Sequence, residues 1–139
     1  MSDLGRFIKA QERSYYTALD EIRGGRKESH WTWYIFPQIE GLGSSPTAQY
    51  YAISSLEEAE DYLNDPVLGP RLEEISEALM KLSTSDPSAV FGWPDDMKLK
   101  SSMTLFSLVA PKGSVFERVL DKYYDGDRDD LTLSIVGRR

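Results

Sequence analysis

Apolar residues recur every three or four positions along most of this chain, which is the spacing of one face of an α-helix. The clearest example is the first segment, whose large or apolar positions are Leu4, Phe7, Ile8, Gln11, Tyr15, Ala18, Leu19 and Ile22. Asp3 is a candidate N-cap for this helix, and Gly24 followed by Gly25 is a candidate stop. The pattern therefore predicts a long first helix in which one polar residue, Gln11, lies on the apolar face.

Capping signals indicate further helices along the chain. Candidate N-cap residues begin several segments, at Ser45, Ser55, Asp86, Ser114 and Asp129 or Asp130. Both Ser55 and Ser114 are followed three residues later by Glu, which is the pattern of a capping box. Apolar stripes at helical spacing also run through 70–82 and 97–109. We therefore expect an all-α fold, a compact bundle of about six to eight short helices in a single domain over residues 1–139.

The stretch HWTWYIFPQ, residues 30–38, fits this helical pattern less well. Its ring-bearing and β-branched residues alternate between two sets, Trp31, Trp33 and Ile35 in one and Thr32, Tyr34 and Phe36 in the other. Such residues favour strands, so a short strand is one interpretation. No second segment with turn chemistry is available to pair with it, and an unpaired strand leaves its backbone groups unsatisfied. We therefore favour a helical turn, whose rings are candidates for the core or for a pocket wall.

Charge and residue content restrict the classes of function. The chain has 16 Lys and Arg against 23 Asp and Glu, and this net charge of −7 opposes binding to a nucleic acid polymer. A small phosphate-bearing ligand is compatible with that charge, because the field at short range depends on nearby groups. The chain has no cysteine, no apolar signal core at its start and no run of about 18 apolar residues. We expect a cytoplasmic protein that does not enter a membrane, and nothing in the sequence indicates an oligomeric state.

Familiar catalytic and metal-binding motifs do not match. His30 is the sole histidine and cysteine is absent, so we expect neither a transition-metal site nor a cofactor. The GLG sequence at 41–43 starts like a dinucleotide fingerprint, but Pro46 stands at the third glycine position. The DGDRDD sequence starts like a calcium loop, but Asp130 and Val136 replace the glycine and the final glutamate of that motif. We interpret both stretches as loop and capping chemistry.

Several polar residues lie within otherwise apolar motifs, where each must be paired or must meet a ligand. They are Gln11, Gln38, Asp95, Lys98, Ser101 and Ser102, of which the last four are spaced to share one helical face. In one interpretation the amides and hydroxyls bond to loop backbone, and Lys98 pairs with Asp95 or Asp96 at the surface. In the other interpretation these groups line a pocket.

Four stretches of the chain are distinctive: RFIKAQE, GGRKESHWTWYIFPQIEGLGSSPTAQYYAI, EEAEDYLNDPVLGPRLEE and PDDMKLKSSMTLF. Together, and in this order, they resemble the bacterial domain of unknown function family numbered 1810, over nearly the whole chain. The resemblance implies a mainly helical fold with no established activity. Some members of that family carry the label calpastatin, but nothing in this chain resembles a protease-inhibitor repeat. The layout is also similar to the NADAR family of ADP-ribose-linked enzymes, which are small helical domains with aromatic and Gln-containing motifs.

Our first functional hypothesis is a site for a nucleotide-like or ADP-ribose-like ligand. Rings would stack on its planar base, cations would meet its phosphate, and amides and hydroxyls would bond its sugar or base edge. The candidate ligand-binding residues are Gln11, Arg26, Lys27, Trp31, Trp33, Tyr34, Gln38, Lys98, Ser101 and Ser102. The catalytic candidates are His30, which would move a proton, and Asp95, which would assist hydrolysis of an N-glycosidic bond.

The alternative hypothesis is a non-catalytic interaction module, in which the ring-rich face contacts a protein partner and the polar residues shape the loop. The two hypotheses predict different surfaces. An enclosed pocket that contains His30, Gln38 and Lys98 would favour the ligand, whereas a flat and exposed patch of rings would favour the partner.

Overall fold

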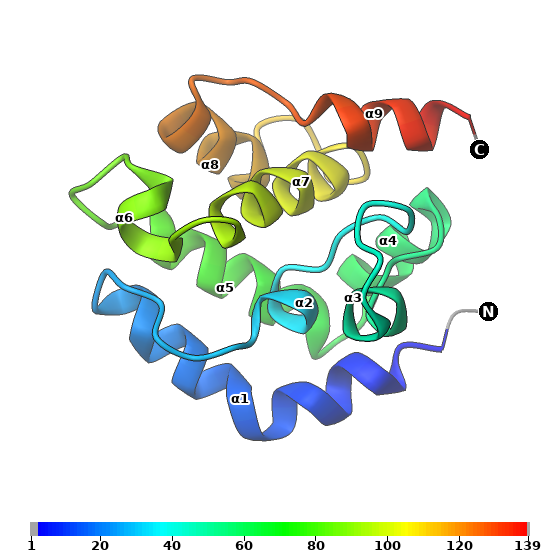
Figure 1. The fold of residues 1–139 in the computed structure, drawn as a ribbon, viewed down its shortest axis with the longest axis horizontal. Coiled ribbons are helices and arrows are strands. Elements are labelled where there is room, and N and C mark those ends of the chain that lie inside the picture. The colour runs from blue at the N-terminus through cyan, green and yellow to red at the C-terminus, as the bar shows by residue number, and fades with distance from the viewer. Residues whose placement is uncertain (1–2, 139) are drawn as a thin grey trace.

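The computed structural model describes residues 3–138, and within that range it contains nine helices joined by short loops (Figure 1). They are α1 (Gly5–Arg23), α2 (Thr32–Ile35), α3 (Pro46–Tyr50), α4 (Leu56–Asn64), α5 (Leu68–Met80), α6 (Pro87–Phe91), α7 (Asp95–Ser107), α8 (Val115–Tyr124) and α9 (Asp130–Gly137). The predicted all-α fold is confirmed, and the count exceeds the expected six to eight because α2, α3 and α6 are single turns. Residues 1–2 and 139, the ends of the predicted domain, lie outside the described part.

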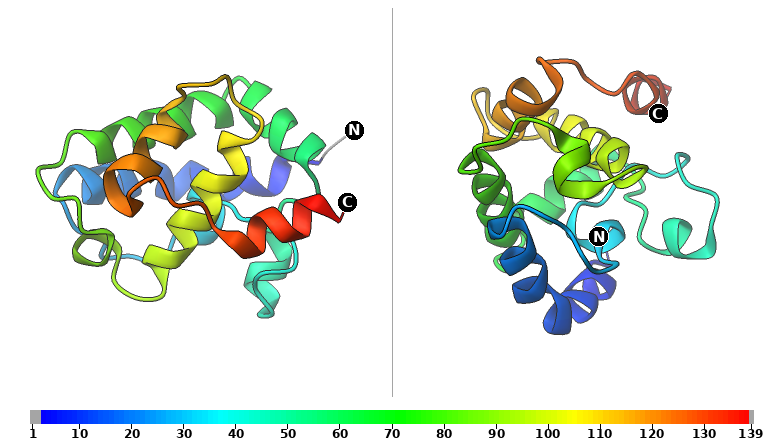
Figure 2. Two further views of the ribbon diagram at one scale, coloured as in Figure 1. Left: turned by 90° about the horizontal axis from the view of Figure 1, so that it is seen from above. Right: turned by 60° about the vertical axis from the view of Figure 1, so that its left-hand side comes forward.

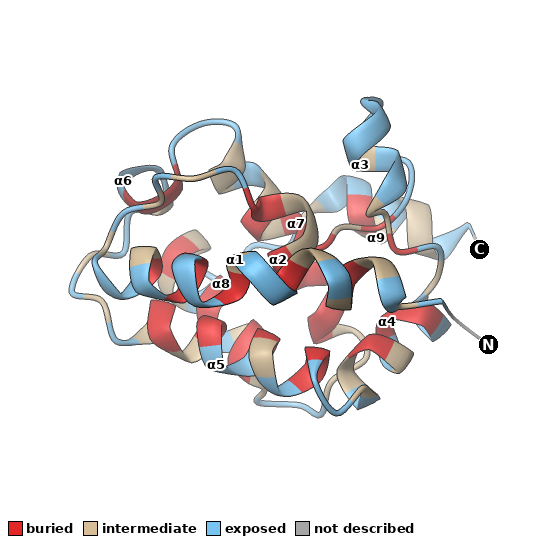
Figure 3. Ribbon diagram, turned by 90° about the horizontal axis from the view of Figure 1, so that it is seen from below, coloured by how far each residue is buried: buried red, intermediate tan, exposed pale blue. Residues whose placement is uncertain are grey.

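Helix α7 lies at the centre of the molecule, where it contacts α2, α4, α6, α8 and α9. All of residues 101–107 are buried, so the second half of α7 is covered on every side. Helix α5 packs against α1, α4 and α8, and Figure 3 shows how the buried faces of these helices turn inward. Helix α9 runs along the outside of α7 (Figure 2). The core is therefore formed by helices on all sides of α7.

The capping predictions explain where most helices begin. The side chains of Ser45, Ser55, Asp86, Ser114 and Asp129 each accept a hydrogen bond from a backbone N–H in the first turn of the following helix. The expected cap at Asp3 is different, because α1 begins at Gly5 and its N-cap residue is Leu4, which makes no side-chain bond. Asp3 instead accepts a hydrogen bond from the N–H of Gly5 through its carboxylate. The predicted stop is confirmed, since Gly24 caps α1 and Gly25 follows with a positive φ of 85°.

The ring-rich stretch 30–38 forms the helical turn α2, as favoured from the sequence. On a helical turn Trp31 and Ile35 point to one side, and both are buried in the core with Phe36. Trp33 and Tyr34 point elsewhere and stay half-buried. Residues 3–138 contain no strand, and their extended pairing is limited to a parallel bridge between Ile39 and Ile53.

The loop between α1 and α2 is organised by Glu21. Its Oε1 accepts hydrogen bonds from the N–H groups of Glu28 at 2.7 Å and Ser29 at 2.9 Å, and from the indole of Trp31 at 2.9 Å. Its Oε2 accepts the hydroxyl of Ser29 at 2.6 Å. Burial alone would raise the pKa of this carboxyl, but the hydrogen bonds, led by that from the Ser29 hydroxyl, lower it to about 2. The contacts of Glu21 with Ser29 and Trp31 are therefore strongest while its carboxylate is ionised.

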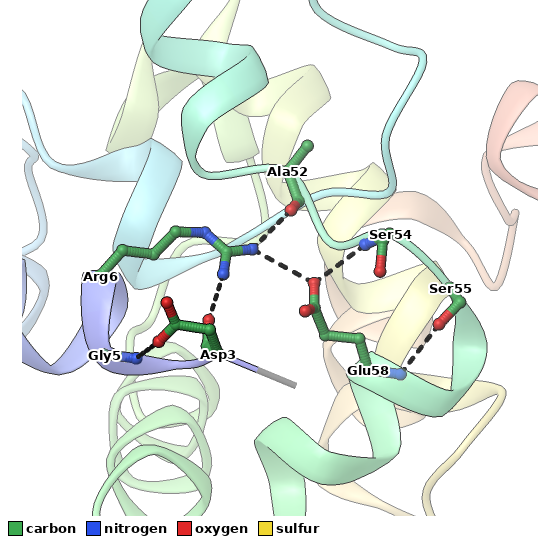
Figure 4. Close-up of polar contacts among 7 residues, drawn as sticks. All are labelled: Asp3, Gly5, Arg6, Ala52, Ser54, Ser55 and Glu58. Atoms are coloured by element: carbon green, nitrogen blue, oxygen red, sulfur yellow. Dashed lines mark hydrogen bonds and ion pairs between the residues drawn. The ribbon is translucent and has the colours of Figure 1, made fainter. Parts of the chain in front are cut away.

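A second loop, residues 40–52, stands out from the body and carries α3 (Figure 2). Its two ends are joined at the bridge, where the N–H of Glu40 donates to Ile53 and the N–H of Ile53 donates to Gln38, both at 2.8 Å. The returning end is also held by Arg6, which donates to the carbonyl of Ala52 and to the carboxylate of Glu58 (Figure 4). The base of the loop is therefore fixed, although no residue within 40–52 is buried.

We expect Gly69→Ala to destabilise the protein by at least about 2 kcal/mol, although alanine is the better helix former. A Cβ atom at Gly69 would lie 2.1 Å from the backbone oxygen of Leu63, so α4 and α5 would have to move apart. Gly137→Ala in α9 is the matched control, because a Cβ there meets nothing within 4 Å. Urea unfolding measures both, and equal effects of the two substitutions would contradict the close approach.

We expect Glu21→Gln to lower the free energy of unfolding by about 1–2 kcal/mol at pH 7, after allowance for solvent screening. The pKa of Glu21 is lower in the folded state than its ordinary value of 4.5, so its contribution is complete above pH 4.5 and is lost as the pH falls towards 2. The difference between parent and variant should therefore shrink over that interval. Urea midpoints at several pH values test this, with the exposed neighbour Glu28→Gln as control, and a difference that stays constant with pH would contradict it.

Candidate functional site

The structure places a ring-lined hollow between α2 and the loop 40–52, which we call the aromatic dish. It has a volume of about 560 Å³, opens widely to solvent and is lined by His30, Trp33, Tyr34, Pro46, Thr47, Tyr50 and Tyr51. One wall comes from α2 and from His30, two residues before it, and the other comes from α3 and the residue that follows. The fixed base of the loop sets the spacing between these two walls.

The tyrosine rings of the dish contact one another at steep angles. Tyr34 and Tyr51 have centroids 5.2 Å apart with planes at 53°, and Tyr50 and Tyr51 are 4.9 Å apart at 80°. The hydroxyl of Tyr34 donates to Ser14 on α1, and Tyr51 packs on Phe7, so these two rings are fixed by the body of the molecule. Tyr50 is different, since it is 61% exposed at the rim. The dish thus has a rigid floor and one exposed ring.

A line of alternating charges and rings connects α7 to α2. The carboxylate of Asp95 contacts two ammonium groups, that of Lys27 at 2.9 Å and that of Lys98 at 3.2 Å. Each ammonium also lies over a tryptophan ring, Lys27 at 5.2 Å from the centroid of Trp31 and Lys98 at 4.5 Å from that of Trp33. We call Lys27, Asp95 and Lys98 the charge cluster. It carries one surplus positive charge beside Trp33, which is a wall of the dish.

The charge cluster determines which chemistry Asp95 can perform. Burial alone would raise the pKa of its carboxyl, but the hydrogen bonds and charges of Lys27 and Lys98 outweigh burial, and the pKa lies below its ordinary value. Asp95 is therefore an ionised carboxylate with both oxygens engaged. Such a group is poorly suited to donate a proton to a leaving group. This geometry argues against Asp95 as a proton donor, and any other part of Asp95 in hydrolysis stays a prediction.

The expected meeting of His30, Gln38 and Lys98 in one pocket takes a different form. His30 is exposed at the edge of the dish, whereas Gln38 lines a separate small hollow with Gly43, Ala48 and Gln49. The two hollows share Trp33 and Tyr51 as a common wall, and Lys98 lies over the ring of Trp33. The three residues therefore surround one tryptophan without entering one enclosed cavity.

Four other predicted ligand-binding residues lie away from the dish or inside the core. Gln11 is buried and donates to the carbonyl of Tyr34 at 2.8 Å and to the hydroxyl of Tyr62 at 3.0 Å. Ser101 donates to the carbonyl of Met97 and to Asp129, which connects α7 to α9. Ser102 is fully buried in α7, and Arg26 is exposed in the loop before α2. The hydroxyl of Ser101 bonds to the preceding turn of its helix, so its place in an apolar motif did not require a ligand. The hydroxyl of Ser102 and the Oε1 of Gln11 are buried without a hydrogen-bond partner among residues 3–138.

The predicted ring residues divide into two groups. Trp31 is 1% exposed and belongs to the core, where Phe36 and Phe91 pack on it. Trp33 and Tyr34 line the dish. Neighbouring rings of this stretch thus belong to the core and to the wall of the dish, because a helical turn directs successive side chains to different sides.

The sequence interpretation missed the second wall of the dish. Pro46, Thr47, Tyr50 and Tyr51 were assigned only to a capped helix after a glycine-rich loop. The signal was present as the pair Tyr50 and Tyr51, two large rings at the end of a short polar helix. Their use as a wall depends on the bridge between Ile39 and Ile53, which folds the loop back towards α2.

Neither metal-binding nor membrane-spanning features are found in the part of the chain that the structure describes. Within residues 3–138 no group of three or more His, Cys, Asp or Glu side chains is placed to hold a metal ion. Within the same range no helix is both long enough and apolar enough to span a bilayer.

The chain matches the model of a family described as a protein of unknown function (DUF1810) over residues 1–136. It is also similar to the crystal structure of the conserved hypothetical protein Rv1873 from Mycobacterium tuberculosis. The two share 46% sequence identity and a TM-score of 0.95, over 97% of this chain and 96% of that one. No curated protein matches the sequence. The family resemblance expected from the motifs is confirmed, and the chain belongs to the DUF1810 family of proteins of unknown function.

Proposed function

We propose that the aromatic dish binds a small ligand that combines a planar ring with a phosphate group, as nucleotides and ADP-ribose derivatives do. The observation that carries the proposal is the position of Lys98, whose ammonium lies over Trp33 at the wall of a hollow lined by four aromatic rings. The dish and the ammonium of Lys98 thus share the ring of Trp33, which places a cation beside the ring-lined hollow.

The rings supply the first part of the binding energy. Stacking of a base on an aromatic side chain contributes about 1–3 kcal/mol in single-stranded nucleic acid complexes. Trp33, Tyr34, Tyr50 and Tyr51 are the rings that line the dish, and Tyr50 is the most exposed of them. The imidazole of His30 lies at the same edge and offers a polar contact to the sugar or base.

The charge cluster supplies the second part. Lys98 uses one contact for Asp95, and its side chain is 23% exposed, so it has donors left for a phosphate oxygen. The net charge of −7 opposes an anion at long range, but screening limits this repulsion to about 8–10 Å at physiological salt. Within that distance the charge cluster contributes one surplus positive charge to the local field. The proposal is limited to binding, because Asp95 is not available as an acid for N-glycosidic hydrolysis.

The open shape of the dish is the form expected for the second candidate, a contact face for a protein partner, and differs from the enclosed pocket expected for a ligand. Tyr50 is 61% exposed at the end of α3 in the projecting loop, and tyrosines are enriched at interfaces. A screen of compounds separates the two candidates. Purified protein is heated with adenosine 5′-monophosphate, ADP-ribose, adenosine and inorganic phosphate, and the melting temperatures are compared. A partner face responds to none of them, whereas a ligand site responds to the compounds that combine ring and phosphate.

We expect adenosine 5′-monophosphate or ADP-ribose to raise the melting temperature, since a ligand at about 100 times its Kd stabilises the native state by about 2.7 kcal/mol. Adenosine and inorganic phosphate should give smaller shifts because each provides half of the contacts. Equal melting temperatures with and without every compound would contradict the proposal.

We expect Lys98→Met to abolish that shift and to change the stability of the unliganded protein by less than about 1 kcal/mol, because Asp95 keeps Lys27 as a partner. The matched control is Lys100→Met on the same helix, which removes the same charge from a lysine that lies over Tyr124 instead. Titration of each variant with the active compound is the measurement. Equal binding by the two variants would show that Lys98 does not serve the ligand.

A further inference from the structure

The position of Lys98 needs an explanation of its own. A lysine side chain is a flexible stem that loses rotamer freedom when its ammonium is held in one place. Two contacts hold it here, the carboxylate of Asp95 at 3.2 Å, one turn earlier on α7, and the ring of Trp33 on α2. A cation that is already held where a ligand needs it binds more tightly than a mobile one, because the ligand does not have to order it.

Asp95 is itself held by a second cation. The side chain of Lys27 is only 7% exposed, and its ammonium contacts Asp95 at 2.9 Å. The backbone N–H of Lys27 donates to the carbonyl of Val90 at 2.7 Å, which fixes this lysine against the end of α6. Asp95 therefore connects a buried and fixed lysine to a partly exposed one.

The second lysine also sets the charge of the cluster. Lys98 with Asp95 alone would be a neutral pair, with little attraction for an anion. Lys27 adds one positive charge, so the three groups together carry +1 (two ammonium groups and one carboxylate). The arrangement thus holds the exposed lysine in place without removing its attraction for a phosphate.

We infer that Asp95 is a positioning residue for the ligand of the aromatic dish: it holds the ammonium of Lys98 against Trp33, and Lys27 provides the charge that makes this compatible with anion binding. The inference rests on the proposed function and gives the three residues different parts. Lys98 contacts the phosphate, Asp95 positions Lys98, and Lys27 stays buried behind them. Neither Asp95 nor Lys27 touches the ligand.

The substitution Asp95→Asn separates positioning from simple charge, because the two predict opposite signs. Removing a carboxylate makes the site more positive, so charge alone predicts tighter binding of a phosphate. Loss of positioning predicts weaker binding, since the ligand must then order Lys98 itself. We expect the Kd for adenosine 5′-monophosphate to rise by roughly 3- to 10-fold.

Asp96→Asn is the matched control. It removes the same charge at the next position, but Asp96 accepts from the hydroxyl of Ser88 and the N–H of Met97 and contacts neither lysine. We expect its Kd to equal that of the parent or to fall slightly. Binding is followed by tryptophan fluorescence in a Trp93→Phe background, because Trp93 is exposed outside the dish and would add an unrelated signal.

Two further variants exclude a purely structural effect. Lys27→Met with Asp95→Asn removes the buried cation together with its partner, so it keeps the net charge of the parent and leaves no buried charge unpaired. It should fold and show the same loss of affinity as Asp95→Asn. Asp95→Glu retains the carboxylate and should recover most of the affinity, whereas a merely structural role would not be rescued by charge.

The outcomes are distinct. If the parent does not bind adenosine 5′-monophosphate or ADP-ribose, the proposed function and this inference both fail. If the parent binds and Lys98→Met does not, but Asp95→Asn binds as well as the parent or better, the site is retained and the positioning role of Asp95 is overturned. Weaker binding by Asp95→Asn and by the double variant, with Asp96→Asn unchanged, supports the inference.

Discussion

The burial of Trp31 is the constraint on which the arrangement of this protein depends. Its indole is 1% exposed among the rings of Phe36 and Phe91, and a buried indole N–H needs a hydrogen-bond acceptor. Glu21, in the last turn of α1, provides it and also binds the backbone of the loop that leads to α2. One carboxylate thus connects the first helix to the ring-rich turn and sets how that turn enters the core.

The orientation of Trp31 determines that of its neighbour two residues on. Since α2 is a single helical turn, burial of Trp31 and Ile35 directs Trp33 away from the core. There it lies under the ammonium of Lys98 and forms a wall of the aromatic dish. The core and the aromatic dish therefore depend on the same helical turn, because this turn places Trp31 in the interior and Trp33 at the surface.

The charge cluster shows how an acidic protein can present a local positive charge. Lys27 and Lys98 lie over the two tryptophans, and Asp95 lies between them. The ring faces stabilise the ammonium groups, and the carboxylate limits their mutual repulsion. The cluster joins α7 to the segment around α2, so it contributes to packing as well as to the field at the dish. A single substitution in it changes both properties, which is why binding and stability have to be measured together.

Local chemistry determined the helices, and the sequence shows it. The N-caps at Ser45, Ser55, Asp86 and Ser114 act within three residues of the helix they begin, so they could be recognised without knowledge of the rest of the fold. The stripe of α1 likewise predicted its buried face, including Gln11. The family motifs indicated the chain's relatives for the same reason, since they are properties of the sequence itself.

The site depended on contacts between distant segments, which periodicity does not encode. Lys27 and Asp95 are far apart in the sequence and meet because α6 and α7 pack beside the loop before α2. Residues that suggested a ligand site from the sequence therefore also form an ion cluster with one another. Tyr50 reaches the dish because Ile39 and Ile53 close the loop between them. The hydroxyl of Ser101 bonds to Asp129, which lies 28 residues further along the chain, so local spacing did not reveal this partner. The sequence by itself thus determined which residues form helices and which carry charge. The tertiary structure alone decided which of those charges and rings face one another. Such contacts depend on how the helices pack, and not on the residue spacing within any one helix.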